Sequence, residues 1–470
     1  MAVAADQPAV TALRALALVV AGCAAAAASG CRREEPAASR RPNVLLVSID
    51  TLRADRLGAY GHDRPTSPTF DTRLAAAGVL FERAISQSPK TTPSHLTMLT
   101  GLAPCAHRVG MWTDEHPPRA LAPSVRTLAE ELRDAGYRTA AFTAGGHVHA
   151  SRGFGRGFDV YEHDRPLERT LAWLADHGDE PFFVFFHTYE VHDPYTPPRR
   201  LRQRFAPDLP APLHAVVDRI RRQPRGWEEA HRAFWAAVDA RDPAHVQAVA
   251  SLYDAGIRRM DDRTLTPLLE ALDHAGVAEH TLVVFTSDHG DAFGEHGVFL
   301  HDDVHLGTVH VPLVLRLPGV LPAGRRVEAP VGVLDVMPTV LAVLGLPVPA
   351  GVQGRSLLPQ IRDDDATSAP PVVSEYLAPD GTVVARSIRT PSLSLVRGAS
   401  GDRLYDLGAD ARERHDLAAT RPGDLAVLET MLGTWEQRCA PLAAAHPPAF
   451  AAAEPDAETR AGLRALGYLP

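Results

Sequence analysis

Short, uninterrupted runs of apolar, β-favouring residues recur along the chain and constrain its fold more than any other feature. The first, Asn43–Ile49, contains no charged residue. Strands with apolar side chains on both faces are typical of parallel sheets that are covered on both sides. Four similar runs follow the first, at Thr139–Thr143, Phe182–Phe186, Leu282–Phe285 and Val311–Leu315.

Amphipathic stretches separate these runs. Ser124–Ala135 and Leu265–Ala275 match a helical pattern, and Gly276 follows the second stretch, where a helix would end. Because strand and helix patterns alternate, the sequence predicts an α/β fold whose sheet is covered on both faces.

The N-terminus has the features of an export signal. Arg14 precedes the apolar run Ala15–Ala28, which is short for a membrane span but typical of a signal peptide. Cys23 and Cys31 each follow small residues, as in the lipobox of bacterial lipoproteins, where a cysteine becomes the lipidated N-terminus. Residues 1–31 are therefore predicted to be a signal or lipoprotein peptide of an exported protein, periplasmic or held at the cell surface.

The choice between the two cysteines stays open. Cys23 fits the lipobox better, whereas Cys31 lies where a polar tether, residues 32–41, begins. If Cys31 is the anchor, Cys105 and Cys439 remain as an even pair, which suits an oxidising compartment. A cleaved signal without a lipid is the remaining alternative.

The rest of the chain divides into two parts. Residues 42–365 are predicted to form the main domain, interrupted by Arg199–Asp262, an arginine-rich helical insertion whose charges indicate a solvated face. Acidic and proline residues around Asp363–Pro371 resemble a linker. Short alternating segments and helical stretches follow, so residues 366–470 are predicted to form a smaller α+β subdomain.

The composition excludes one class of partner. The 48 basic and 57 acidic residues give a formal net charge of −9, whereas nucleic-acid binding needs a basic face. Lys90 is the only lysine and Asn43 the only asparagine, a bias that a GC-rich bacterial genome would produce.

Residues with metal-ligand or acid–base chemistry directly follow three predicted strands. Asp50 follows the first, His187 follows Phe182–Phe186, and the Leu282–Phe285 strand leads to Ser287–Asp291. Ligands of open α/β sheets bind outside the carboxyl ends of the strands, so these residues should share one edge.

A short predicted helix adds a hydroxyl group. It begins near Lys90, Thr91 or Thr92 can cap it, Pro93 suits its first turn, and Gly101 can end it. Backbone N–H groups and the helix dipole stabilise negative charge at a helix N-terminus. The segment is therefore suited to hold a phosphate- or sulfate-like group.

Together these segments resemble motifs of the sulfatase family of the alkaline phosphatase superfamily. The similar motifs are Ser48–Asp55, Thr91–Gly101 and Ser287–Gly290, and the resemblance spans about residues 42–470. It implies a central mixed sheet flanked by helices, with a small C-terminal α+β subdomain. It also implies a metal-dependent hydrolase of sulfate or phosphate esters.

Position by position, the resemblance implies metal ligation by Asp50, Thr91, Asp288 and His289, with Thr91 as the nucleophile. True sulfatases have Cys or Ser at that position, oxidised to formylglycine. Oxidation of threonine would give a ketone, so no formylglycine is expected here. Thr51 stands where many sulfatases have a second aspartate, so one oxygen ligand is missing.

The resemblance favours Ca²⁺ as the metal, and Mg²⁺, Mn²⁺ and Zn²⁺ are alternatives. A two-zinc site that also uses His187, His192 and His301 is a further alternative. One metal is preferred, because Thr188 stands where an aspartate of the second site would be.

Further residues receive expected roles in catalysis. Lys90 should offset charge on the transferred group, and His192 or His301 should protonate the leaving alkoxide. Substrate contacts are expected from the remaining histidines near these motifs: His95, His147, His149, His187 and His305.

The sequence therefore predicts an ester hydrolase that forms a covalent intermediate on Thr91. One alternative is a phosphodiesterase or a phosphoglycerol- or phosphoethanolamine-type transferase of the same superfamily. Another is an inactive relative that only binds its ligand. The expected substrate is a small-molecule, glycan or lipid ester, and membrane contact is expected only through the N-terminal lipid anchor.

Overall fold

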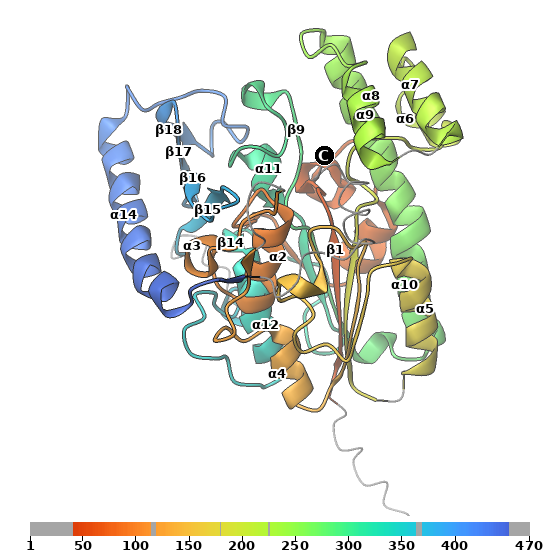
Figure 1. Cartoon of the computed structure of the whole chain (residues 1–470), viewed down its shortest axis with the longest axis vertical. Helices are drawn as coiled ribbons and strands as arrows, with labels where there is room; N and C mark the ends of the chain where they lie inside the picture. The colour runs from red at the N-terminus through yellow and green to blue at the C-terminus, as the bar shows by residue number, and fades with distance from the viewer. Residues whose placement is uncertain (1–40, 114–118, 179, 224–225, 363–368, 451–470) are drawn as a thin grey trace, which may run out of the picture. The chain divides into compact units, whose positions relative to one another are not determined.

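The structure is a computed structural model that describes residues 41–113, 119–178, 180–223, 226–362 and 369–450 (Figure 1). The predicted signal peptide and nearly all of the predicted tether lie outside these residues. Pro42–Pro470 form one compact unit. Among the described helices, none combines the length and apolar character needed to cross a bilayer.

The main sheet is built around β1 (Asn43–Ile49), whose seven residues are all buried. It has eight strands in the order β13-β2-β12-β8-β1-β7-β5-β6. β1 is parallel to β7 (Phe182–Thr188) and β8 (Thr281–Thr286), whereas β12 (Leu313–Arg316) is antiparallel to β8. The sheet is therefore mixed, as expected. Its other strands are β2 (Val79–Phe81), β5 (Arg138–Phe142), β6 (Val160–Glu162) and β13 (Arg325–Val327).

The parallel register brings the ends of three strands to one edge. Ser48 of β1 pairs with His187 of β7 and with Thr286 of β8. The residues that follow, Asp50 and Asp288 among them, consequently leave the sheet side by side.

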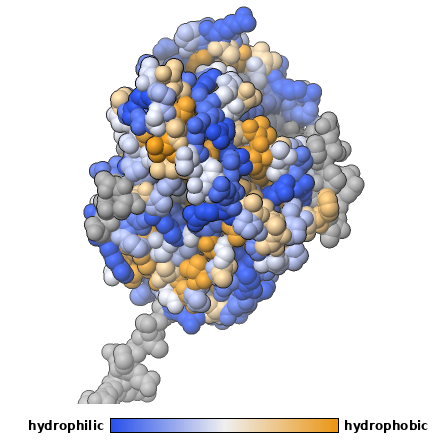
Figure 2. Space-filling model, turned by 90° about the vertical axis from the view of Figure 1, so that its left-hand side faces the viewer, coloured by the Kyte–Doolittle hydropathy of each residue, from blue (hydrophilic) through white to orange (hydrophobic). Residues whose placement is uncertain are grey.

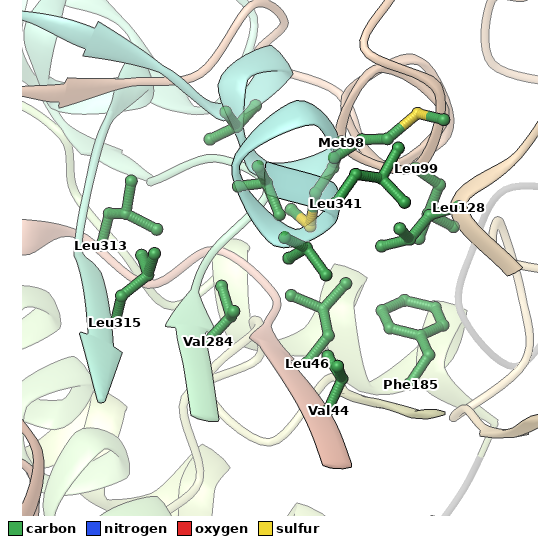
Figure 3. Close-up of a cluster of buried hydrophobic side chains, with 14 of the residues drawn as sticks. Val44, Leu46, Met98, Leu99, Leu128, Phe185, Val284, Leu313, Leu315 and Leu341 are labelled. Atoms are coloured by element: carbon green, nitrogen blue, oxygen red, sulfur yellow. The ribbon is translucent and has the colours of Figure 1, made fainter. Parts of the chain in front are cut away.

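Apolar clusters cover both faces of the sheet. On one face, Val44 and Leu46 of β1 pack with residues of α2 (Thr91–Thr100), α4 (Leu128–Asp134) and α12 (Val336–Val343) (Figure 3). On the other face, Leu45 and Val47 belong to a cluster with α5 (Pro166–Asp176), α9 (Pro243–Met260) and α10 (Thr266–His274). Both faces of β1 are therefore buried, as its uninterrupted apolar run predicts.

Two elements differ from the sequence prediction. The run Val311–Leu315 is split: β11 (His310–Val311) pairs with β3 (Ala84–Ile85), and only β12 joins the main sheet. Pro312 lies between them and has no N–H group to continue the ladder.

The second difference is the start of α4, which begins at Leu128 and not near Ser124. Thr127 accepts a hydrogen bond from the Glu130 N–H, and the Glu130 carboxylate accepts one from the Thr127 N–H. This reciprocal cap sets where the helix begins.

The described residues of the insertion Arg199–Asp262 are largely helical, as predicted. Its helices are α6 (Arg199–Phe205), α7 (Ala211–Arg222), α8 (Trp227–Trp235) and α9. In Figure 1, α6, α7 and α8 stand at the upper right, and α9 runs down from there along the sheet.

The C-terminal subdomain is α+β, also as expected. Four antiparallel strands, β15 (Val372–Leu377), β16 (Val383–Arg389), β17 (Leu393–Gly398) and β18 (Gly401–Asp406), pack against α14 (Pro422–Ala445). Leu428 and Leu432 of α14 are buried against this sheet. The face in Figure 2, which carries α14, intersperses hydrophilic and hydrophobic residues.

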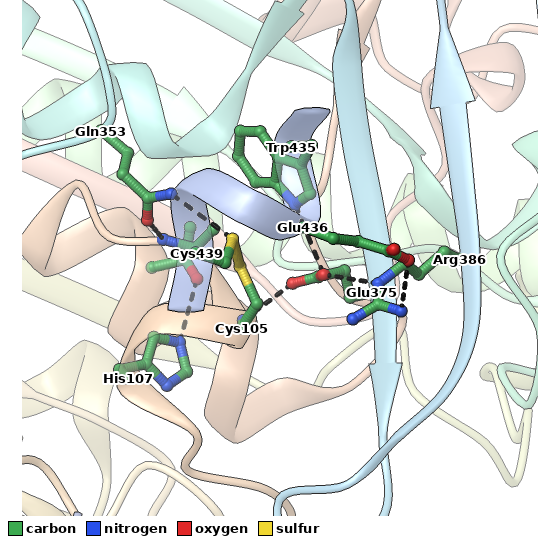
Figure 4. The surroundings of a disulfide bond; sticks show 10 residues. Cys105, His107, Gln353, Glu375, Arg386, Trp435, Glu436 and Cys439 are labelled. Carbon is green, nitrogen blue, oxygen red and sulfur yellow. Dashed lines mark hydrogen bonds and ion pairs between the residues drawn. A yellow bond between two sulfur atoms is a disulfide. The ribbon is translucent and has the colours of Figure 1, made fainter. Parts of the chain in front are cut away.

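A disulfide joins the subdomain to the main domain. Cys105 of α3 (Pro104–His107) is bonded to Cys439 of α14 (Figure 4). Glu375 of β15 accepts hydrogen bonds beside it from the Cys105 N–H (2.7 Å) and the Arg386 guanidinium (3.0 Å). Cys105 and Cys439, the two cysteines that remain if Cys31 is the anchor, are thus bonded to each other.

Candidate active site

Two buried carboxylates meet where β1 and β8 end. Asp50 and Asp288 are inaccessible to solvent, and Asp50 Oδ1 and Asp288 Oδ2 make no hydrogen bond within the described structure. Burial raises the pKa of Asp50 to about 7. Burial and then the neighbouring Asp50 raise the pKa of Asp288 well above its usual range. Oxygens of this kind fit a divalent cation, which would neutralise both groups.

His289 completes a possible metal site. One ligand atom from each of Asp50, Asp288 and His289 lies within 4.8 Å of the other two. His289 Nδ1 donates to the Gly290 carbonyl oxygen (3.1 Å), which leaves the lone pair on Nε2. Nε2 lies 3.3 Å from Asp288 Oδ2 and 3.3 Å from Thr91 Oγ1.

Thr91 is the first residue of α2 and is fully buried. The predicted threonine cap is wrong: Lys90 occupies the N-cap, and Thr92 Oγ1 donates instead to the His147 carbonyl oxygen (2.8 Å). Gly101 ends the helix in the left-handed region, with φ of 64°, as predicted. The Thr91 hydroxyl therefore lies at the positive end of the helix, next to the carboxylate pair.

Thr51 helps to hold the Asp288 carboxylate through its backbone N–H group. Its φ is 58°, a left-handed conformation that is unfavourable for a β-branched residue. Its N–H donates to Asp288 Oδ1 (3.3 Å), while its hydroxyl donates to the Asp50 carbonyl oxygen (2.7 Å). The strained backbone thus positions the Asp288 carboxylate.

Two buried histidines contact Asp50 and Thr91. His187 Nε2 lies 3.4 Å from Asp50 Oδ2. His95 Nδ1 donates to the Thr91 carbonyl oxygen (2.9 Å), and its Nε2 lies 2.9 Å from Ser48 Oγ. Burial lowers the pKa of His95 to about 4 and that of His187 to about 3. Both imidazoles are therefore neutral at neutral pH.

His301 is held by Asp291, which ends the predicted Ser287–Asp291 segment but received no role of its own from the sequence. Its Nδ1 lies 2.7 Å from Asp291 Oδ1, and Asp291 Oδ2 accepts a hydrogen bond from the Tyr195 hydroxyl (2.6 Å). The ring centroid of His301 is 4.4 Å from that of His289. The signal that could have revealed Asp291 is its position directly after Gly290.

His192 faces the same region. Its ring centroid is 5.7 Å from that of His301, and its Nδ1 donates to the Asp193 carbonyl oxygen (2.9 Å). Burial lowers its pKa, but Asp193, Asp50 and Asp291 outweigh burial, so the pKa lies above its usual value. His192 is thus suited to donate a proton.

Lys90 places a positive charge at the rim of the candidate active site. Its Nζ forms an ion pair with Asp302, and it lies 5.2 Å from the ring centroid of Tyr376. The Tyr376 hydroxyl donates to Asp302 Oδ1 (3.1 Å). Because Tyr376 belongs to β15, the C-terminal subdomain helps to form the site.

Two of the predicted substrate-binding histidines, His149 and His305, have other neighbours, whereas His147 lies near the site. Burial, and then the charges of Arg152, Lys90, His192 and His301, lower the pKa of His147 well below its usual value. His149 Nδ1 accepts a hydrogen bond from the Ser151 N–H (3.2 Å) and so caps a short 3₁₀ turn. His305 Nδ1 lies 2.9 Å from Asp303 Oδ2, and the His305 ring stacks on His296 at 3.7 Å.

Comparison with known proteins gives consistent matches. The Sulfatase family model matches residues 42–346, and the model of the N-sulphoglucosamine sulphohydrolase C-terminal region matches residues 294–432. The uncharacterized sulfatase YidJ of Escherichia coli (strain K12) is 25% identical over 439 residues, which cover 80% of this chain and 83% of that protein. A Δ4,5-hexuronate-2-O-sulfatase of Bacteroides thetaiotaomicron is 26% identical, with 81% and 85% covered.

Solved structures share the fold. A 2-O GAG sulfatase superposes with a TM-score of 0.69 at 22% identity, covering 85% of this chain and 93% of its own. The phosphonate monoester hydrolase of Agrobacterium radiobacter superposes with a TM-score of 0.65 at 23% identity, covering 85% and 96%.

Proposed function

The chain belongs to the sulfatase family of the alkaline phosphatase superfamily, and we propose that it is a metal-dependent hydrolase of sulfate or phosphate esters with Thr91 as its nucleophile. The observation that carries the proposal is the position of Thr91 Oγ1, 3.3 Å from His289 Nε2 and beside the buried Asp50–Asp288 pair. A hydroxyl held against metal-binding groups at a helix N-terminus is suited to attack an anionic ester.

The metal would be held by Asp50, Thr91, Asp288 and His289. Family resemblance favours Ca²⁺, with Mg²⁺, Mn²⁺ or Zn²⁺ as alternatives. A divalent cation bound there would lower the pKa of the Thr91 hydroxyl and offset charge on the ester, and the Thr91 proton would leave to solvent.

The chain's own residues carry out the transfer. The Thr91 oxygen forms a bond to sulfur or phosphorus as the bond from that atom to the alcohol oxygen breaks. His301 or His192 donates a proton to the departing alcohol oxygen. Water then attacks the threonine ester, returns a proton to the neutral histidine, and releases sulfate or phosphate with free Thr91.

The two histidines are supported in different ways. Asp291 accepts the Nδ1 proton of His301, so that Nε2 is the nitrogen that exchanges a proton with the alcohol oxygen. His192 gains its proton affinity from the surrounding carboxylates. The Lys90 ammonium and the N-terminus of α2 offset charge on the oxygens of the transferred group.

The atom that the Thr91 oxygen attacks has two alternatives, the sulfur of a sulfate ester and the phosphorus of a phosphate ester. Relatives include an ulvan-active sulfatase of Formosa agariphila and a human N-acetylgalactosamine-6-sulfatase, which favours a sulfated glycan or a similar small molecule. The Thr91 nucleophile favours phosphorus, because threonine cannot form the aldehyde hydrate that expels sulfate. Two phosphonate monoester hydrolases share the fold.

The protein is proposed to be exported, with a lipid anchor at Cys23 or Cys31. The Cys105–Cys439 disulfide supports an oxidising compartment. Metabolic labelling with a fatty acid, compared between Cys23→Ser and Cys31→Ser variants, tests the anchor. Absence of label from the unmodified protein would contradict it.

Turnover of a substrate panel tests the catalytic proposal. The metal-loaded chain is assayed with p-nitrophenyl sulfate, phosphate, phosphate diester and phosphonate monoester. Thr91→Ala should lose at least about 1000-fold in kcat, while Thr91→Ser retains activity. Mass spectrometry of the acid-quenched reaction should find a sulfo- or phospho-adduct on Thr91 and no formylglycine.

Thr92→Ala is the matched control, because the Thr92 hydroxyl binds the His147 carbonyl oxygen and should not take part in the chemistry. Full turnover by Thr91→Ala would refute the nucleophile. Ligand binding without turnover of any ester by the metal-loaded protein would favour the inactive relative.

A further inference from the structure

A buried aspartate links helix α8 of the insertion to one of the two candidate proton donors. Asp193 directly follows His192, and three side chains of α8 bind it: Trp227, His231 and Trp235. We propose that His231 is a positioning residue for the reaction, which acts through Asp193 to hold the His192 ring in the orientation and tautomer that proton donation needs. The proposal rests on the role that the proposed function gives to His192.

Asp193 holds the His192 ring from its Nδ1 side. His192 Nδ1 lies 2.9 Å from the Asp193 carbonyl oxygen and 3.2 Å from Asp193 Oδ1. Because both of these oxygens are acceptors, the proton on Nδ1 faces them, and Nε2 is the nitrogen that exchanges a proton with the alcohol oxygen. The position of the Asp193 carboxylate therefore decides which nitrogen of His192 takes part in the chemistry.

The α8 side chains hold Asp193 in turn. His231 Nδ1 lies 2.5 Å and Trp235 Nε1 lies 3.0 Å from Asp193 Oδ2. The Trp227 Nε1–H donates to the Asp193 carbonyl oxygen (2.6 Å). These side chains follow one another at intervals of four residues, so they lie along one face of α8. Asp193 is only 2% exposed, and a carboxylate buried this deeply depends on such donors.

His231 makes the shortest contact with the carboxylate and is itself held in place. Its ring stacks on Trp227, with the centroids 4.3 Å apart. On the other side of Asp193, the His192 ring centroid is 5.7 Å from that of His301, within the candidate active site. His231, Asp193 and His192 thus form a continuous line of contacts from the insertion to the reacting groups. No sequence motif marked His231 for this role.

The same contacts predict how replacement of Asp193 by Asn would act. The N–H groups of His231 and Trp235 both face the Oδ2 position, so they should keep the amide oxygen there. The amide NH₂ group would then face His192 Nδ1. A donor at this place disfavours the protonated ring, which carries a proton on both nitrogens.

The leaving group provides the test, since a proton donor matters most when the departing alcohol is a poor leaving group. The metal-loaded protein is assayed with the phenyl and p-nitrophenyl esters of sulfate and of phosphate. On the phenyl ester, His231→Leu should lower kcat/KM about 10-fold and Asp193→Asn about 10- to 100-fold. On the p-nitrophenyl ester, whose alcohol leaves without a proton, each variant should lose less than about 3-fold.

Two further variants separate positioning from a general loss of structure. His231→Asn, whose amide N–H can take the place of Nδ1, should recover most of the activity on the phenyl ester. His214→Leu is the matched control, because His214 is an exposed histidine of the insertion that also pairs with an aspartate, Asp218 (3.4 Å). This control should leave both esters unaffected. Equal losses on the two esters, or no recovery by His231→Asn, would overturn the proposal.

Nitrogen-15 NMR of the histidine-labelled protein reads the tautomer of His192 without turnover. Its signal is assigned by its loss in His192→Gln. At alkaline pH the wild type should carry the ring proton on Nδ1, and Asp193→Asn should carry it on Nε2. The same tautomer in both proteins would overturn the positioning role. If the tautomers differ as expected but the wild type hydrolyses no ester, the proposed function fails while the contact between Asp193 and His192 stands.

Discussion

Asp291 Oδ1 lies 2.7 Å from His301 Nδ1, and this contact fixes which nitrogen of His301 faces the reacting groups. Because a carboxylate accepts the Nδ1 proton, Nε2 is the nitrogen available for proton transfer. The Tyr195 hydroxyl, 2.6 Å from Asp291 Oδ2, holds the carboxylate in turn.

Replacing Asp291 by Asn should weaken catalysis without unfolding the site. The amide can donate to Nδ1 and stabilise the wrong tautomer, so kcat should fall about 10- to 100-fold. The pH dependence of kcat should also shift, a change that simple loss of packing would not produce. Asp303→Asn, which removes the matching contact to His305, is the control. An unchanged pH profile for Asp291→Asn would contradict the positioning role.

The thermal stability of the Asp50–Asp288 site should change in opposite directions when the metal is removed and when one carboxylate is replaced. Chelation should lower Tm and abolish turnover, and metal at about 100 times its Kd should restore about 2.7 kcal/mol of stability. In metal-free protein, Asp288→Asn should equal or exceed the wild type in Tm, because burial and Asp50 both disfavour the charged form of the Asp288 carboxyl group and the amide carries no charge. The same variant should no longer be stabilised by Ca²⁺. Equal metal stabilisation of both proteins would exclude Asp288 as a ligand.

Protonation of His107 should account for part of the stability that the folded protein loses at acidic pH. It is fully buried, its Nδ1 accepts from the Val109 N–H (3.1 Å), and burial lowers its pKa to about 3. The unfolded chain binds a proton near pH 6.5, whereas the folded protein does not. Stability should therefore fall by about 1.4 kcal/mol per pH unit between pH 6.5 and pH 3.

His107→Asn keeps an acceptor for the Val109 N–H but cannot be protonated. It should be less stable than the wild type at pH 7, yet its Tm should fall less between pH 7 and pH 5. His415→Asn, at an exposed residue, is the matched control. Identical pH slopes for the wild type and His107→Asn would rule out this assignment.

The Cys105–Cys439 disulfide should stabilise the folded chain strongly, because it closes a loop between residues 334 positions apart. Replacing both cysteines by Ser should cost about 2–5 kcal/mol, measured by denaturant unfolding. Reductant should lower the Tm of the wild type toward that of the double variant and leave the variant unaffected. A reductant effect on the double variant would point to another cause.

A buried ion pair ties the C-terminal subdomain to the loop after His301. Arg389 donates to Glu413 (2.9 Å) and to the Val304 carbonyl oxygen (2.8 Å), and Glu413 accepts from the Leu306 N–H (2.8 Å). Glu413→Ala leaves a buried guanidinium unpaired and should cost about 3–5 kcal/mol. Adding Arg389→Met to this variant should recover much of that stability. If nothing is recovered, the loss comes from the contact of Glu413 with the Leu306 N–H and not from the unpaired guanidinium.

Much of the site was predictable because parallel strands align their carboxyl ends. Asp50 directly follows β1, His187 is the last residue but one of β7, and Asp288 lies two residues beyond β8, so the sheet brings them to one edge. The helix that begins at Thr91 was also recognisable, although its N-cap was not. Lys90 takes that position without a side-chain cap, which residue preferences do not anticipate.

The sequence by itself predicted the central strands β1, β5, β7 and β8, the helical character of the insertion and the candidate site residues, because apolar periodicity and local motifs act over a few neighbouring positions. Only the tertiary structure decided which side chains support them. Asp291 with His301, Tyr376 with Asp302 and Trp227 with Asp193 join segments through loop closure and helix packing. Such contacts depend on the summed packing of distant segments, which no local pattern records.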